Sequence, residues 1–266
     1  MNRDLQRHHE SLAKKGWTIR EFQDKSVITD HVNVISRELG CDLDSIQQKF
    51  QTREEQYLFM EKFSEVLNNM EFTKKLFLRE TPFIKSLLGP DILIQQKVFL
   101  RLQKPHCESD SPGLHRDTFY GNSVEHINFW VPLIELFPGA GLALVEGSHL
   151  TPSVNVRHTE YKDDDRKNVS KGSLANKLGF VYAPKIDDSI SKLSGGELKI
   201  VTPKLGEYLV FFGNMIHGGS NESSHPRVSF DIRFTHPFHH SSVDSQFFTV
   251  FSQGVVSQVK EKFLSK

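Results

Sequence analysis

The chain has 266 residues, enough for one large domain that buries a hydrophobic core without disulfide bonds. Its 33 Lys and Arg residues balance 33 Asp and Glu residues, which argues against nucleic acid or an anionic membrane as the main partner. The two cysteines, the polar start and the lack of a long apolar run argue against a disulfide scaffold, a signal peptide and a membrane helix. We therefore expect a cytoplasmic protein of one domain, residues 1–266.

Residues 1–90 are expected to form mostly helices that support the rest of the domain. Thr52 and Glu55 have the spacing of a capping box, in which each side chain accepts a hydrogen bond from the backbone amide of the other residue. Gly89-Pro90 should end the helical region, because neither residue continues a helix.

From residue 91 to about 240 the pattern changes to short strands. Apolar and polar residues alternate over 97–103, 126–131 and 227–234, so each of these strands should have one apolar and one polar face. We expect the apolar faces to pack under the helices and the polar faces to line a wet cavity. Such a pattern is typical of a barrel or jelly roll with an internal site. The predicted fold class is α+β with a mainly β core.

Two further segments complete the expected organisation. Residues 151–196 form a long polar connection, and long connections in compact domains are often lids or binding loops. We expect a lid over the mouth of the barrel, with a solvated surface loop as the alternative. Residues 241–266 are expected to be a C-terminal tail.

The candidate metal site begins with His115 and Asp117. Residues two apart in an extended segment point to the same side, so this imidazole and carboxylate can bind one cation. The short motif alone also arises by chance. The more specific signal is His217, followed ten residues later by Arg227-x-Ser229. Arg227 and Ser229 share one strand face, where a guanidinium and a hydroxyl can together bind a carboxylate.

These motifs follow the order found in a known family. Between His115-Arg-Asp117 and His217 the chain has three further motifs of that family: Trp130-Val-Pro-Leu133, Gly147-Ser-His149 and Gly206-Glu-Tyr-Leu-Val-Phe-Phe212. Over about residues 95–236 the chain resembles the phytanoyl-CoA dioxygenase-like family of iron(II)- and 2-oxoglutarate-dependent oxygenases. The resemblance implies a double-stranded β-helix, a cupin-like jelly roll, with N-terminal helices packed on it.

The resemblance also implies the roles of individual residues. Iron(II) would be bound by His115, Asp117 and His217, and the distal carboxylate of the cosubstrate 2-oxoglutarate by Arg227 and Ser229. A looser assignment places Trp130, Asn128 and Gln103 around the cosubstrate. With dioxygen, such a site hydroxylates or otherwise oxidises a small molecule and releases succinate and carbon dioxide.

Two departures and two alternatives accompany this interpretation. The family often has Ser where this chain has Gly219, and usually has Asp where this chain has Glu207. A non-redox cupin-type isomerase or epimerase could use the same metal ligands, although it needs no clamp for a dicarboxylate. A jelly-roll carbohydrate-binding module would need no buried triad. Asp231 and Arg233, on the same strand face as Arg227, are either an internal ion pair or contacts to the substrate.

Overall fold

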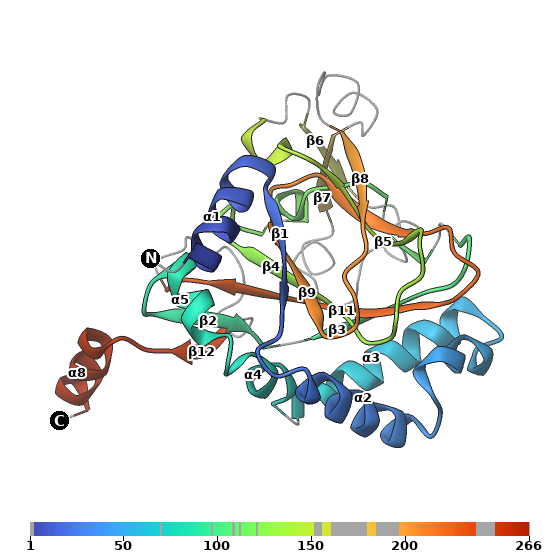
Figure 1. The fold of residues 1–266 in the computed structure, drawn as a ribbon, viewed down its shortest axis with the longest axis horizontal. Coiled ribbons are helices and arrows are strands. Elements are labelled where there is room, and N and C mark those ends of the chain that lie inside the picture. The colour runs from blue at the N-terminus through green and yellow to red at the C-terminus, as the bar shows by residue number, and fades with distance from the viewer. Residues whose placement is uncertain are drawn as a thin grey trace.

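The computed structural model describes residues 3–69, 71–96, 98–107, 110–111, 113–120, 122–151, 156–160, 180–184, 197–237 and 248–265. The larger of its sheets has seven strands, all paired antiparallel. In spatial order they are β1 (Trp17–Glu21), β9 (Glu207–Phe212), β4 (Ile127–Pro132), β11 (Arg227–Thr235), β2 (Ile92–Gln95) and β12 (Phe248–Ser252), with β3 (Phe99–Gln103) also paired to β11 (Figure 1).

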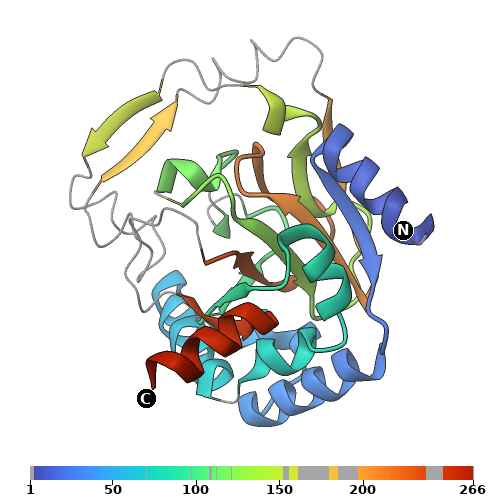
Figure 2. The ribbon, with the colours of Figure 1, turned by 90° about the vertical axis from the view of Figure 1, so that its left-hand side faces the viewer.

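A second, three-stranded sheet contains β10 (His217–Asn221), β5 (Ala140–Val145) and β8 (Leu198–Val201), in that spatial order. A third pair, β6 (Val156–Glu160) and β7 (Phe180–Pro184), forms a hairpin that projects from the other two sheets in Figure 2. β7 lies next to the short helix η3 (Asp117–Tyr120), which begins at a candidate metal ligand. The rest of the expected lid, residues 152–155, 161–179 and 185–196, lies outside the described residues.

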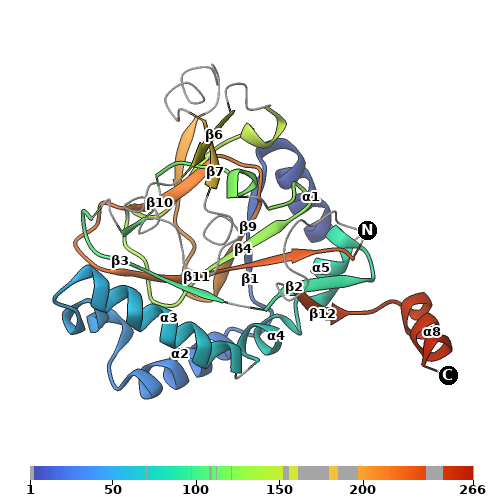
Figure 3. The ribbon, with the colours of Figure 1, turned by 180° about the vertical axis from the view of Figure 1, so that it is seen from behind.

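The helices lie mainly on one side of the larger sheet (Figure 3). They are α1 (Arg3–Lys15), α2 (Ser26–Leu39), η1 (Leu43–Lys49), α3 (Arg53–Asn69), α4 (Phe72–Phe77), α5 (Thr81–Leu88), η4 (Ser148–Leu150) and α8 (Val255–Leu264). The capping box expected at the start of α3 is present, because the Glu55 amide donates to Thr52 Oγ1 at 3.2 Å and the Thr52 amide to Glu55 Oε2 at 3.3 Å. No helix in the described ranges is long and apolar enough to cross a bilayer.

Aromatic side chains join the helices to the outer face of the larger sheet. The ring of Phe77 in α4 lies 5.4 Å from that of Phe129 in β4 and 5.3 Å from that of Phe234 in β11. Edge-to-face contacts at these distances add to the stabilisation from burial of the rings. Because side chains alternate along a strand, this packing turns the polar residues of β4 and β11 toward the second sheet. The expected apolar and polar faces are thus both present.

Two strands lie outside the range where strands were expected. β1 falls within residues 1–90 and pairs with β9 over five residues, while β12 falls within the expected tail and pairs with β2. Each is a short strand that completes a sheet by pairing with a segment far away in the sequence. Local alternation over five residues does not reveal such long-range pairing.

Candidate metal centre

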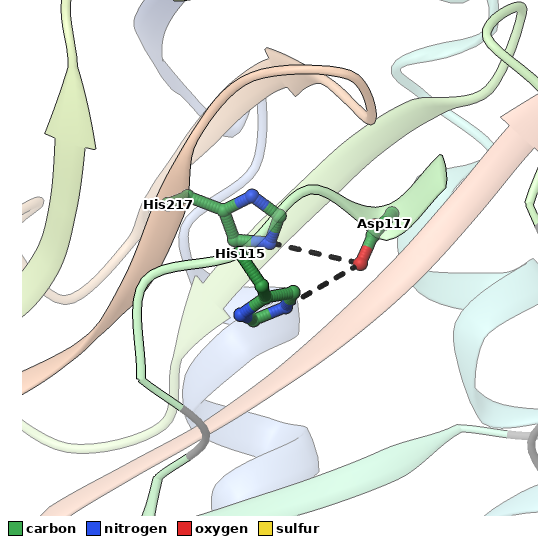
Figure 4. A group of neighbouring side chains, drawn as sticks. All are labelled: His115, Asp117 and His217. Carbon is green, nitrogen blue, oxygen red and sulfur yellow. Dashed lines mark ion pairs between the residues drawn. The ribbon is translucent and has the colours of Figure 1, made fainter. Parts of the chain in front are cut away.

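The backbone brings the two histidines of the predicted triad side by side. His115 forms an isolated antiparallel bridge with His217, the first residue of β10, and each amide donates to the carbonyl of the other residue at 2.8 Å. Asp117 begins η3, and its amide donates to the Gly213 carbonyl at 2.9 Å. One ligand atom from each of the three side chains lies within 4.8 Å of the others. Figure 4 shows the two imidazoles and the carboxylate turned toward one another.

The two imidazoles present the same nitrogen to Asp117. Nδ1 of His115 donates to the Gly113 carbonyl at 2.8 Å, and Nδ1 of His217 donates to the Met215 carbonyl at 2.9 Å. Such a hydrogen bond to a carbonyl fixes the tautomer and leaves the lone pair on Nε2. Both Nε2 atoms lie 3.7 Å from Oδ1 of Asp117, so three donor atoms of a metal site converge on one point.

The electrostatics keep His217 and Asp117 in the protonation states that a metal needs. Burial, together with the neighbouring His115, lowers the pKa of His217 to about 4, so its imidazole is neutral at physiological pH. Burial by itself would raise the pKa of Asp117. The positive charge of Arg233 and the two histidines outweigh that effect and hold the pKa of Asp117 well below its ordinary value.

The second oxygen of Asp117 is held by the larger sheet. Oδ2 accepts hydrogen bonds from Asn128 Nδ2 at 2.6 Å and from Arg233 Nε and Nη2 at 3.2 and 3.0 Å. Arg233 also lies 3.6 Å from Asp231, which pairs with Arg101 at 2.7 Å. Asp231 and Arg233 therefore form an internal network of ion pairs, one of the two roles that the sequence left open.

A cavity of about 70 Å³, measured as the volume that a water molecule's centre can occupy, lies beside the triad. A single water needs roughly 10–15 Å³ by this measure, so several water-sized groups fit. Arg227 lines the cavity and is 3% exposed, and its guanidinium carbon lies 5.5 Å from the ring centre of Trp130. Burial, with Arg101 nearby, lowers the pKa of Arg227 to about 9.

Arg227 differs from the other two arginines of the cavity in its partners. Nη1 donates to the Gly141 carbonyl, but the buried Nε has no hydrogen-bond partner among the described residues. Within the same ranges no carboxylate lies within ion-pair distance of Arg227. A buried guanidinium without a counter-charge is costly, so this position calls for an anionic ligand.

Three of the remaining predicted pocket residues carry buried oxygens without a hydrogen-bond partner among the described residues. Gln103 Oε1, Ser229 Oγ and Asn128 Oδ1 are buried and have no hydrogen-bond partner in the described part of the chain. Asn128 and Trp130 line the cavity directly, whereas Ser229 and Gln103 are not among the residues that line it. Asn128 also binds the candidate ligand Asp117, a contact that the sequence did not reveal.

The glycine that departs from the family pattern leaves room for neighbouring polar groups. A Cβ atom at Gly219 would lie 2.4 Å from Ser111 Oγ, 2.7 Å from Arg227 Nη2 and 2.9 Å from Gln103 Oε1. Ser111 Oγ also accepts a hydrogen bond from the Gly219 amide at 3.0 Å. A hydroxyl from a distant loop therefore lies where a side chain at position 219 would project.

This crowding gives a specific prediction for the variant Gly219→Ala. The atoms that clash are the ends of side chains, so the fold should accommodate the methyl group while Arg227 and Ser111 move. We expect a midpoint of thermal unfolding close to that of the wild type, unchanged iron affinity and weaker binding of 2-oxoglutarate. Calorimetric titration of the iron-loaded protein measures this; unchanged 2-oxoglutarate affinity would separate Gly219 from the cosubstrate site.

Sequence reasoning missed several residues of the site. Asp110, Ser111 and Phe211 line the cavity. Phe211 lies in the motif Gly206–Phe212, whereas no sequence pattern marked Asp110 or Ser111. Arg116, between two candidate ligands, is buried and donates to the carbonyls of Ser148, Thr151 and Asn214. These hydrogen bonds hold the segment that carries the two candidate ligands against its neighbours. The position of Arg116 between those ligands was the only sequence feature that pointed to this role.

Comparison with solved structures identifies known proteins of similar fold. The chain is similar to the apo form of ThoJ, a non-heme monooxygenase, with a TM-score of 0.60 and 15% identity over 92% of this chain and 83% of that one. It is also similar to the epimerase SnoN in complex with Fe3+, alpha ketoglutarate and nogalamycin RO, with a TM-score of 0.54 and 14% identity over 93% and 98% of the two chains. AviO1 from Streptomyces viridochromogenes gives a TM-score of 0.52 at 15% identity over 90% and 98%.

The chain has the double-stranded β-helix fold of these non-heme enzymes. The predicted fold class, a mainly β jelly roll with N-terminal helices, is thereby confirmed. No protein-family model matches the chain, and no curated protein sequence matches it either. At identities near 15% the similarity establishes the fold, and the chemistry has to be argued from the site itself.

Proposed function

We propose that the protein is an iron(II)- and 2-oxoglutarate-dependent oxygenase that hydroxylates or otherwise oxidises a small molecule, with release of succinate and carbon dioxide. One observation carries the proposal. A three-ligand metal site and a buried arginine without a carboxylate partner open into the same cavity.

The donor set favours iron as the metal. Two histidines and one carboxylate on one side of an ion are typical of non-heme iron oxygenases, because three positions remain for external ligands. Iron bound by His115, Asp117 and His217 would supply the activation of dioxygen once a 2-oxo acid is bound beside it. The protein's own residues fix the donor atoms, bind the cosubstrate and limit access of water.

The charges of the cavity favour a dicarboxylate as the cosubstrate. Of the three arginines that line it, Arg101 is paired with Asp231 and Arg233 with Asp117. Only Arg227 keeps an uncompensated charge within the described part of the site. A 2-oxo dicarboxylate can place its distal carboxylate on Arg227 and its oxo-acid end on the metal. Ser229, whose hydroxyl has no partner in the described residues, would donate to the same carboxylate and complete this clamp.

Solved structures of the same fold support a small-molecule substrate. The SnoN structure contains nogalamycin RO together with Fe3+ and alpha ketoglutarate, and SnoN is an alpha ketoglutarate dependent epimerase. In this chain β7 lies next to η3, which begins at Asp117, and this supports a role for residues 151–196 on the substrate side of the cavity.

The test measures turnover of 2-oxoglutarate. The protein is reconstituted with iron(II) without oxygen, mixed with 2-oxoglutarate, and exposed to oxygen with a panel of small metabolites while succinate is quantified. We expect iron-dependent succinate formation that one class of compound accelerates. Iron binding without any affinity for 2-oxoglutarate would favour the non-redox metalloenzyme, and no metal binding at all would favour the carbohydrate-binding module.

A further inference from the structure

The two oxygens of Asp117 have very different surroundings. Oδ2 accepts three hydrogen bonds, one from Asn128 and two from Arg233. A carboxylate oxygen offers about two lone pairs, so these donors saturate Oδ2. Oδ1 instead faces the Nε2 atoms of both histidines at 3.7 Å. The carboxylate is therefore oriented so that Oδ2 is hydrogen-bonded to the sheet and Oδ1 faces the other two candidate metal ligands.

The donors to Oδ2 are rigidly placed. Asn128 in β4 and Arg233 in β11 are direct partners in the antiparallel register, and both are buried. Arg233 Nη1 donates to Gln95 Oε1 at 3.0 Å, and the same nitrogen lies 3.6 Å from Asp231. The guanidinium is thus held on both sides and cannot follow Asp117 if that carboxylate turns.

We propose that Arg233 is a positioning residue that restricts Asp117 to binding the metal through Oδ1 alone. This inference rests on the proposed function. An iron ion with six positions that takes one atom from each of three protein ligands keeps three for external ligands. A 2-oxo acid uses two of these, and one remains for a diatomic molecule. If Asp117 bound through both oxygens, that last position would be lost.

The proposal predicts an effect that differs from that of a merely structural residue. Without Arg233 only the single hydrogen bond from Asn128 still holds Oδ2, and one bond lets the Asp117 carboxylate turn. The carboxylate also loses a competing positive charge, so saturating iron(II) should still fill the site. Binding of 2-oxoglutarate should persist as well, since two positions and Arg227 remain. What should fail is the binding of a diatomic ligand to the complex of iron and 2-oxoglutarate.

The experiment compares Arg233→Met with Arg101→Lys, which alters another arginine of the same cavity, keeps a positive charge beside Asp231 and does not contact Asp117. Each protein is loaded with iron(II) and saturating 2-oxoglutarate without oxygen. Iron content, the visible absorption of the chelate and the electron paramagnetic resonance signal after addition of nitric oxide are then measured. With iron(II) at saturating concentration, which offsets the weaker metal affinity expected without an outer-shell partner, we expect Arg233→Met to keep the first two. We expect it to lose nitric oxide affinity by at least about tenfold, the lower end of the loss of metal affinity or activity that follows removal of such a partner. Arg101→Lys should resemble the wild type in all three.

Each other outcome has a defined meaning. Wild-type nitric oxide affinity in Arg233→Met, or loss of its iron, overturns the proposal and leaves Arg233 as a structural residue. If Arg233→Met does not fold, Arg233→Lys keeps the buried charge but lacks the two-donor fork, and the same loss of nitric oxide affinity is expected; wild-type affinity there also overturns the proposal. Failure of the wild-type protein to form the chelate would instead contradict the proposed function.

Discussion

Replacing His217 with alanine should abolish stoichiometric iron binding. His217 supplies one of three donor atoms, and the Nδ1 hydrogen bond to the Met215 carbonyl already fixes its Nε2 toward Asp117. Loss of an outer-shell partner of a metal ligand weakens metal binding by about 10–100-fold, so loss of a ligand itself should exceed that range. Iron content after anaerobic reconstitution and equilibrium dialysis gives the measurement.

A matched control is available for this variant. His149 also lies near the end of a strand, but its Nε2 contacts the Ala13 carbonyl at 3.2 Å and its ring stacks on Phe212. His149→Ala therefore removes a partly buried imidazole that is not part of the triad, and it should keep wild-type iron affinity. Iron retained by His217→Ala at wild-type affinity would refute the triad.

The sequence reveals those parts of the site whose residues lie close together in the chain. The pair His115 and Asp117 and the pair Arg227 and Ser229 can each be recognised within a few residues. The strand that carries the second pair alternates clearly, so its polar face could be expected to line a cavity. Phe77 and Phe129 then explain why the opposite face is apolar, because they pack together at 5.4 Å.

The parts that the sequence does not reveal depend on contacts between distant segments. Arg101 and Asp231 are 130 positions apart, and their pairing decides that Arg227 is the arginine left for a ligand. Ser111 reaches the site from an irregular loop, where no periodicity marks a residue as buried or functional. The choice between an ion pair and a substrate contact for Arg233 likewise needed the position of Asp117 in three dimensions.

Replacing Arg227 with lysine should weaken 2-oxoglutarate binding by roughly ten- to a hundred-fold while iron affinity stays unchanged. An ammonium group cannot form the two-donor fork of a guanidinium, and loss of one charge-assisted hydrogen bond costs about 1.5–3 kcal/mol. Calorimetric titration of the iron-loaded variant measures the change. Arg101→Lys is the matched control, because Arg101 already has Asp231 as its partner.

The pH dependence of the same variant separates binding of an anion from general packing. Burial lowers the pKa of Arg227 only to about 9, so the wild-type guanidinium stays charged and its 2-oxoglutarate affinity should be flat between about pH 6 and 8. Burial favours the neutral form of a lysine, and fully buried lysines lose up to about 3–5 units from their ordinary pKa. As the pH rises through that lowered pKa, Arg227→Lys should lose its charge, and its affinity for the dicarboxylate should fall further. Wild-type affinity at every pH would show that Arg227 does not bind the cosubstrate.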